Sequence, residues 1–169
     1  QYSFSLDAPL SGKPQWIKNH RNKTMDIVVQ DLNNVVYLFS NTGTLFWKKQ
    51  LSGPIVGNIK QVDLYKNRRL QMAFRTPNRF QILDRNGKVV PPFDLKLLGQ
   101  SPSHLAVFDY DLNKNYRFLI ADRKKVRMID NRGKTVSGFR LKTLSTGLAH
   151  PPKHVRLGSK DYIVIQSID

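Results

Sequence analysis

Short apolar runs recur along the chain with a period of about 45 residues, which indicates an internal repeat. The runs keep a fixed phase with Gly43, Gly87 and Gly133. Before each glycine, apolar residues alternate with polar ones and end in an apolar pair, a pattern typical of a strand with a buried face. The apolar positions are Val36, Leu38 and Phe39, then Phe80, Ile82 and Leu83, and then Val126, Met128 and Ile129.

Each of these glycines is predicted to close a hairpin turn. A short polar residue stands three positions before it, and its side chain can accept hydrogen bonds from the turn while glycine takes positive φ. The polar residues are Ser40, Asp84 and Asp130. A large ring follows each turn, and we expect it to be buried against a neighbouring part of the fold. The rings are Trp47, Phe93 and Phe139.

Two further apolar runs precede each hairpin, so every repeat is expected to hold four short strands. No segment shows a sustained helical period with caps, and we therefore predict an all-β fold. Four short antiparallel strands per repeat of this length are typical of the blades of a β-propeller. A β-sandwich is the alternative, although it gives no reason for turn, glycine and ring to recur in phase. The preceding runs are 15–17 and 26–30, 61–65 and 70–74, and 104–110 and 116–121.

The period divides the chain into approximate blades at 15–58, 59–103 and 104–150. Residues 1–15 are predicted to be the last strand of a preceding blade, and residues 151–169 the first two strands of a further one. About three and a half blades would be present, and we expect them to belong to a larger propeller, because incomplete blades leave bare sheet edges. The alternative is a small four-bladed ring that is closed by the N- and C-terminal strands.

The segments 41–51, 84–97 and 130–143 resemble the blade repeats of quinoprotein-like (PQQ-type, WD40-like) β-propellers, particularly the non-enzymatic members. This resemblance covers most of the chain. It implies a scaffold for protein–protein interaction in an extracytoplasmic setting, such as a periplasmic, envelope or outer-membrane assembly. The repeat tryptophan is present only at Trp47, whereas Phe93 and Phe139 stand two positions later. Quinone-dependent members are expected to use vicinal cysteines and calcium, and because this chain has no cysteine we expect no such cofactor.

Charge is the most unusual property of the composition. The chain has 28 Lys and Arg against 12 Asp and Glu, a formal net charge of +16. Such a surface attracts nucleic acid, acidic glycans or anionic membranes. The basic residues beside the predicted turns are the candidates for anion binding, although a solvated basic face would have the same composition. They are Arg85, Lys88, Arg123, Lys124, Lys125, Arg127, Arg132 and Lys134.

Two groups of residues have the types that bind metals. Asp109, Asp111, Asn113 and Asn115 alternate as calcium ligands do, but the glycine and glutamate of an EF-hand loop are missing. An Asx-stabilised turn is therefore the favoured interpretation of these residues. His104 and His154 both begin a predicted first strand, where ordinary polar positions are also expected. We therefore predict no resident metal.

The sequence also lacks the common signatures of catalysis and of membrane insertion. It contains no G-x-S-x-G nucleophile elbow and no phosphate-binding G-K-[ST] loop, and its apolar runs fall far short of the roughly 18 residues of a spanning helix. We predict a non-catalytic binding or scaffolding module for a protein partner. The alternative is a module that binds an anionic polymer or membrane surface through its basic hairpin turns.

Overall fold

The computed structural model describes residues 3–98, 105–122 and 124–168 of the chain. Their regular structure consists of strands alone, so the predicted all-β class is confirmed for these residues. The described residues also include no helix that is long and apolar enough to cross a membrane. The strands are β1 Gln15–Lys18, β2 Met25–Gln30, β3 Val35–Phe39, β4 Leu45–Gln50, β5 Lys60–Val62, β6 Gln71–Thr76, β7 Arg79–Leu83, β8 Val89–Lys96, β9 Leu105–Phe108, β10 Arg117–Asp122, β11 Lys125–Asp130, β12 Lys153–Leu157 and β13 Lys160–Val164.

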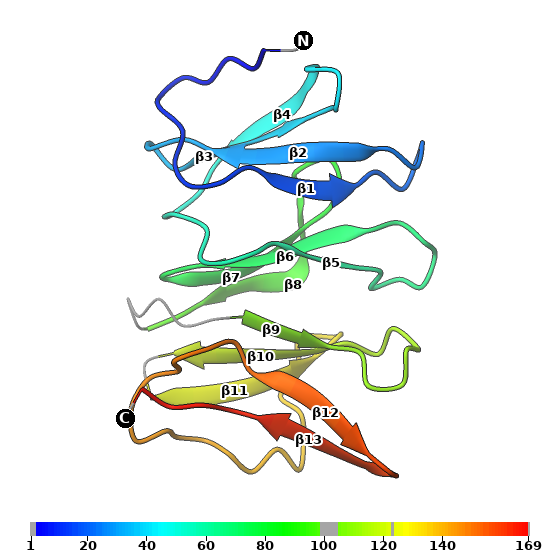
Figure 1. Cartoon of the computed structure of the whole chain (residues 1–169), viewed down its shortest axis with the longest axis vertical. Helices are drawn as coiled ribbons and strands as arrows, with labels where there is room; N and C mark the ends of the chain where they lie inside the picture. The colour runs from blue at the N-terminus through cyan, green and yellow to red at the C-terminus, as the bar shows by residue number, and fades with distance from the viewer. Residues whose placement is uncertain (1–2, 99–104, 123, 169) are drawn as a thin grey trace.

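The strands form four antiparallel sheets that follow one another in chain order. The first sheet has the order β1-β2-β3-β4, the second β5-β6-β7-β8 and the third β9-β10-β11, and β12 pairs with β13. Figure 1 shows these sheets stacked one beneath another, with the N-terminal segment at one end of the stack and the β12–β13 hairpin at the other. Each sheet is therefore built from one sequence repeat.

Successive apolar residues of one strand pack against two different neighbouring sheets. In β6, Met72 and Phe74 pack toward the first sheet, whereas Ala73 packs toward the third. In β10, Phe118 packs toward the second sheet and Leu119 toward the β12–β13 hairpin. Successive side chains of a strand point to opposite faces, so runs that are apolar throughout belong to strands with two buried faces.

The three hairpin turns have the geometry that the sequence suggests. The φ angles of Gly43, Gly87 and Gly133 are 92°, 76° and 76°. In the second turn, Oδ1 of Asp84 accepts hydrogen bonds from the amides of Asn86 and Lys88, at 2.8 and 2.9 Å. Oγ of Ser40 and Oδ1 of Asp130 accept equivalent amide bonds in the other two turns.

A residue of each fourth strand rests on the turn glycine of the next sheet. A Cβ added to Gly87 would lie 2.9 Å from the ring of Trp47, and one added to Gly133 would lie 2.6 Å from Pro92. The indole Nε1 of Trp47 also donates a hydrogen bond to the carbonyl of Arg85, at 2.7 Å. Glycine at these turns therefore serves two purposes, because it adopts positive φ and permits close contact between sheets.

A two-residue insertion explains why Phe93 stands later in its repeat than Trp47. Tyr37 and Gln81 both stand six residues before their turn glycine. Tyr37 pairs with Lys48, five residues after its glycine, whereas Gln81 pairs with Asp94, seven residues after its glycine. This shift of register accommodates Pro91 and Pro92, which are joined by a cis peptide bond. Phe93 is consequently placed in the core, where its ring centroid lies 6.1 Å from that of Phe80 and 5.6 Å from that of Phe118.

The prediction of four strands per repeat is wrong for the third sheet. The segment after Gly133 pairs with β11 only through isolated bridges, Ile129 with Thr135 and Lys125 with Thr143. Gly138, with φ of 81°, lies between these bridges and interrupts the extended backbone. Phe139 nevertheless packs in the cluster between this sheet and the β12–β13 hairpin.

The N-terminal segment also differs from expectation. Residues 3–14 contain a single bridge, Leu10 with Asp31, in place of a blade strand. They cross the outer face of the first sheet, where Phe4 meets the ring of Phe39 edge-on at 5.0 Å and Leu6 packs against the same cluster. No pairing joins them to β12 or β13, so the described residues do not form a ring closed by the terminal strands.

The contact between Trp47 and Gly87 can be tested by Gly87→Ala. We expect a loss of about 2–4 kcal/mol in the free energy of unfolding, because positive φ and overpacking each cost about 1–2 kcal/mol. Gly12→Ala is the matched control, since its φ of 79° is similar and no atom lies within 4 Å of the added Cβ. Urea unfolding of both variants measures the difference. Equal losses would show that Trp47 does not restrict this position.

Candidate functional site

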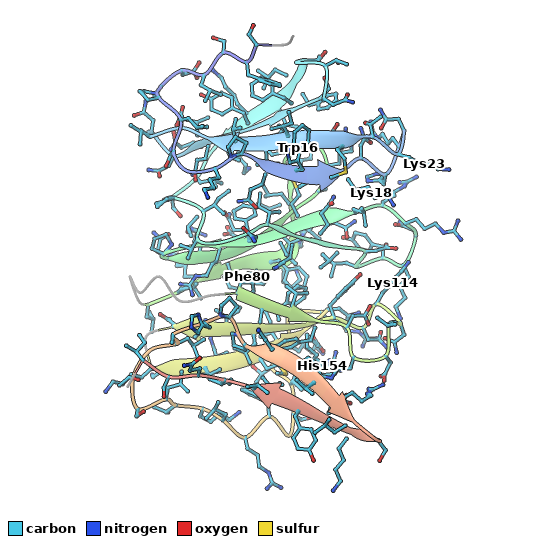
Figure 2. The ribbon with its side chains drawn as sticks, viewed as in Figure 1. Trp16, Lys18, Lys23, Phe80, Lys114 and His154 are labelled. Atoms are coloured by element: carbon cyan, nitrogen blue, oxygen red, sulfur yellow. The ribbon has the colours of Figure 1, made fainter. Side chains whose placement is uncertain are left out.

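The connections along one side of the stack, at the same end of every sheet, bring together basic, aspartate and histidine side chains. In an antiparallel sheet the first-to-second loop and the third-to-fourth turn lie at the same end. We call this the loop end, and Figure 1 shows its long loops emerging on one side of the stack. Lys23 and Lys114 both lie on this side in Figure 2. The loop end comprises the loops 19–24, 63–70 and 109–116 and the turns 40–44, 84–88 and 130–134.

Short polar side chains build the loops of the loop end. Asp63 accepts hydrogen bonds from the amides of Asn67 and Arg68, at 3.0 and 2.8 Å. Asp109 accepts equivalent bonds from Asn113 and Lys114 in the next loop, at 3.0 Å each. The carboxylates are thus used to order the loops, which fixes the basic side chains that the loops carry.

The calcium candidates belong to this loop architecture. Asn113 Oδ1 accepts a hydrogen bond from the amide of Asn115 at 2.9 Å, and Asp111 forms an ion pair with Arg156 at 2.8 Å. Asn115 Oδ1 accepts a hydrogen bond from Nζ of Lys66 at 2.8 Å. Together with the amide bonds of Asp109, these contacts make the segment an Asx-stabilised loop. The described residues contain no group of three or more His, Cys, Asp or Glu placed to hold a metal.

A cleft of about 570 Å³ lies at the loop end, between the first and second sheets. Three connections line it, namely the loops 19–24 and 63–70 and the turn 84–88, and basic side chains predominate among its ionisable groups. We call it the basic cleft. Its lining residues are His20, Arg21, Tyr65, Asn67, Arg69, Leu70, Gln71, Asp84, Arg85 and Asn86.

His20 is held in a defined orientation in the basic cleft. Its Nδ1 accepts a hydrogen bond from the amide of Leu70 at 3.1 Å, so the neutral ring carries its proton on Nε2. Partial burial lowers the pKa of His20, and Arg85, Arg21 and Arg69 lower it further, against a smaller opposing effect of Asp63. His20 is therefore a neutral donor beside several cations.

Arg85 differs from the other arginines of the basic cleft because its charge is already neutralised. It forms an ion pair with Asp26, whose side chain is 1% exposed, and its guanidinium lies 4.9 Å from the centroid of the Phe46 ring. Arg21 and Arg69, in contrast, are exposed and have no ion-pair partner among the described residues. The free positive charge of the cleft is therefore carried by Arg21 and Arg69.

The equivalent junction between the second and third sheets is closed by an ion pair. Nζ of Lys114 lies 2.6 Å from Oδ2 of Asp63, whose side chain is 3% exposed. Burial raises the pKa of Asp63, but the hydrogen bonds from Lys114 and from the amides of Arg68 and Asn67 outweigh it, and the net pKa is lowered. At the second junction, the charge of Lys114 is thus balanced by a carboxylate of the protein itself.

The structure divides the predicted anion-binding residues between the loop end and the opposite end of the sheets. Lys88, Arg132 and Lys134 are exposed at the loop end, as parts of the turns after β7 and β11. Lys124 and Lys125 lie at the start of β11 and therefore at the opposite end, beside a hollow that they line with Leu98 and Asp122. Arg127 is exposed within β11, and Arg123 lies outside the described residues. The candidates therefore do not form one continuous ridge.

Of the two predicted histidines, the structure places His154 in contacts with its own hairpin and with Tyr110. Nε2 of His154 lies 2.7 Å from Oδ1 of Asp161, and the ring packs 4.6 Å from the centroid of Tyr110. The hydrogen bonds from Arg156 and then His154 lower the pKa of Asp161 to about 2. His104 lies outside the described residues. His154 thus belongs to a surface network on the β12–β13 hairpin.

Sequence reasoning named Arg85 of the basic cleft as an anion-binding candidate but missed His20 and Arg21, although a signal for the loops of the cleft was present. An asparagine followed by a basic residue recurs in the loops between first and second strands, as Asn22–Lys23, Asn67–Arg68 and Asn113–Lys114. Each basic residue of these pairs has positive φ, between 63° and 66°. This repeat predicts similar loops, but the gathering of His20, Arg21 and Arg69 depends on contacts between sheets.

The comparisons with known proteins leave the family open. No protein-family model matches the chain, and no curated protein matches it significantly.

The lowered pKa of Asp63 allows a prediction of how the free energy of unfolding depends on pH. Because the folded-state pKa of Asp63 is below its ordinary value of 3.8, its stabilising effect is present above that pH and is lost as the pH falls through the folded value. Asp63→Asn should lower the free energy of unfolding at pH 7 by about 2 kcal/mol, mainly through weaker amide bonds, since Lys114 is partly screened by solvent. It should also reduce the loss of stability in acid.

Urea unfolding between pH 7 and 2.5 measures both effects. Asp111→Asn is the control, because its ion pair with Arg156 is exposed and should contribute much less. An acid transition that is unchanged in Asp63→Asn would contradict the proposed role of Asp63.

Proposed function

We propose that this chain is a non-catalytic binding module of the β-propeller type, which holds a protein partner through an acidic segment lying across the loop end. The propeller part of the proposal is supported by antiparallel sheets in meander order, each made from one repeat and stacked face to face. Blades of a propeller pack in this way, so that each blade buries the faces of its neighbours. The extracytoplasmic location implied by the family resemblance is part of the same proposal.

The observation that carries the binding proposal is the unpaired positive charge of the loop end. None of its exposed basic side chains forms an ion pair within the part of the chain that the structure describes. The nearby carboxylates are used by the amides of their own turns and loops. An acidic partner would supply the missing countercharge. The residues without an ion pair are Arg21, Lys23, Lys66, Arg68, Arg69, Lys88, Arg132 and Lys134, of which Lys66 donates a hydrogen bond to Asn115.

The arrangement of these cations favours an acidic polypeptide over nucleic acid. They lie on separate loops and turns, and Asp84 and Asp130 stand between them. The positive charges are therefore separated from one another and do not form a continuous basic groove. Single-stranded nucleic acid is bound by successive stacking rings along a basic groove. Tyr65 is exposed at the loop end, but Tyr110 and Tyr116 pack against the apolar clusters. Discrete carboxylates of a polypeptide match this pattern better.

Two charge-reversed variants of the same sheet test the role of the loop end. Arg132→Glu/Lys134→Glu changes the loop end, and Lys124→Glu/Lys125→Glu makes the same change of charge at the opposite end. We expect the first variant to weaken binding of labelled poly-L-glutamate at least tenfold, and the second less than threefold, because Coulomb attraction depends on distance and is screened beyond about 10 Å. Fluorescence anisotropy at low and physiological salt measures both affinities.

The result that would overturn the proposal is an equal effect of both variants, since net charge alone would then explain binding. Polyuridylate of the same number of charges provides a second comparison. Tighter binding of polyuridylate than of poly-L-glutamate would overturn the choice of an acidic polypeptide. Backbone amides of residues 132 and 134 make the turn contacts, so the substitutions leave the turn itself intact.

A further inference from the structure

The basic cleft contains hydrogen-bond donors that the protein itself does not use. Arg21 and Arg69 have no ion-pair partner among the described residues. His20 presents Nε2–H, because the amide of Leu70 occupies Nδ1. These groups come from two loops that belong to different sheets, and they line one hollow. We propose that the basic cleft binds the phosphate group of a phosphate monoester, with Arg21, Arg69 and His20 as its donors.

The second junction of the same chain shows what the first junction lacks. There, the loop of the third sheet sends Lys114 to the buried carboxylate of Asp63 in the loop of the second sheet. The loop of the first sheet has Lys18 and Asn19 before its turn, and neither residue provides a carboxylate. Asn19 instead donates to Asp26, which is engaged with Arg85. Arg21 and Arg69 of the first junction are therefore left without an internal anion.

The charge and number of donors match a phosphate group. A phosphate monoester carries a charge of about −1.5 to −2 at neutral pH and three terminal oxygens. Two guanidinium groups balance that charge and can each donate two parallel hydrogen bonds, while His20 supplies a further neutral donor. Two other charges face the cleft: Arg85 is balanced by Asp26, and Asp84 is bound to its own turn amides. A lone carboxylate would leave one of the two free guanidinium groups without a partner.

The size and lining of the cleft indicate that the phosphate is carried on a larger molecule. A volume of about 570 Å³ is in the range of sites for small organic ligands. Tyr65, which is 60% exposed, and Leu70 provide apolar surface beside the cationic groups. A phosphorylated side chain of a protein partner and a soluble organic phosphate share this chemistry. The inference depends on the cleft alone and holds whether or not acidic segments bind across the loop end.

Titration with a phosphoserine-containing tripeptide tests this site. Calorimetry and the NMR signal of the His20 ring should show saturable binding, with sulfate and the unphosphorylated peptide as ligand controls. We expect Arg69→Gln and Arg21→Gln to weaken binding at least tenfold. Lys124→Gln should change it less than twofold, because Lys124 is exposed on the side opposite the loop end and does not line the cleft.

Several outcomes would overturn the phosphate site. They are the lack of saturable binding at ligand concentrations up to ~10 mM, an equal loss in Lys124→Gln, and an unchanged His20 signal at saturation. Competition by inorganic phosphate and glucose 6-phosphate identifies the source of the phosphate: equal affinities support a soluble ligand, and preference for the peptide supports a protein partner. Because the poly-L-glutamate test depends on Arg132 and Lys134, the two proposals can fail separately.

Discussion

The contact between a fourth-strand residue and the next turn glycine determines how the sheets are placed. Trp47 lies on Gly87 and donates a hydrogen bond to the carbonyl of Arg85, while Pro92 lies on Gly133. The contact fixes the spacing of adjacent sheets, and with it the distance between their loops. Arg85, held at this turn, reaches Asp26 of the first sheet and lines the basic cleft. The packing that stabilises the stack thus also shapes the candidate site.

The acidic residues of the chain are used almost entirely for structure. All 12 are aspartates, and every aspartate that the structure describes accepts at least one hydrogen bond from a backbone amide or from another side chain. Aspartate suits this use, because its short side chain reaches the amides of its own turn. Exposed basic residues such as Arg21 and Arg69 consequently have no ion-pair partner among the described residues, and they contribute to the net charge of +16.

The sequence predicts local features of this fold well because they depend on local chemistry. Strand positions, the turns closed by Ser40, Asp84 and Asp130, and the burial of Phe93 all follow from alternation and turn residues. The irregular chain after Gly133 was missed because Ser137–Gly138 interrupts an otherwise strand-like pattern. The separation of Lys124 from Arg132 could have been predicted, since successive turns of a meander lie at opposite ends. The basic cleft could not, because it joins loops from separate repeats.

The two sheet junctions show how one loop design can serve either stability or binding. Both contain a basic residue with positive φ that follows an asparagine, Arg68 in one loop and Lys114 in the next. At the second junction Asp63 binds that cation through a carboxylate that is itself buried. At the first junction no carboxylate occupies the equivalent place, and His20 and two arginines face solvent in a cleft. Repulsion between the two guanidinium groups is a cost that an anionic ligand would remove, which is why the first junction is the better candidate for function.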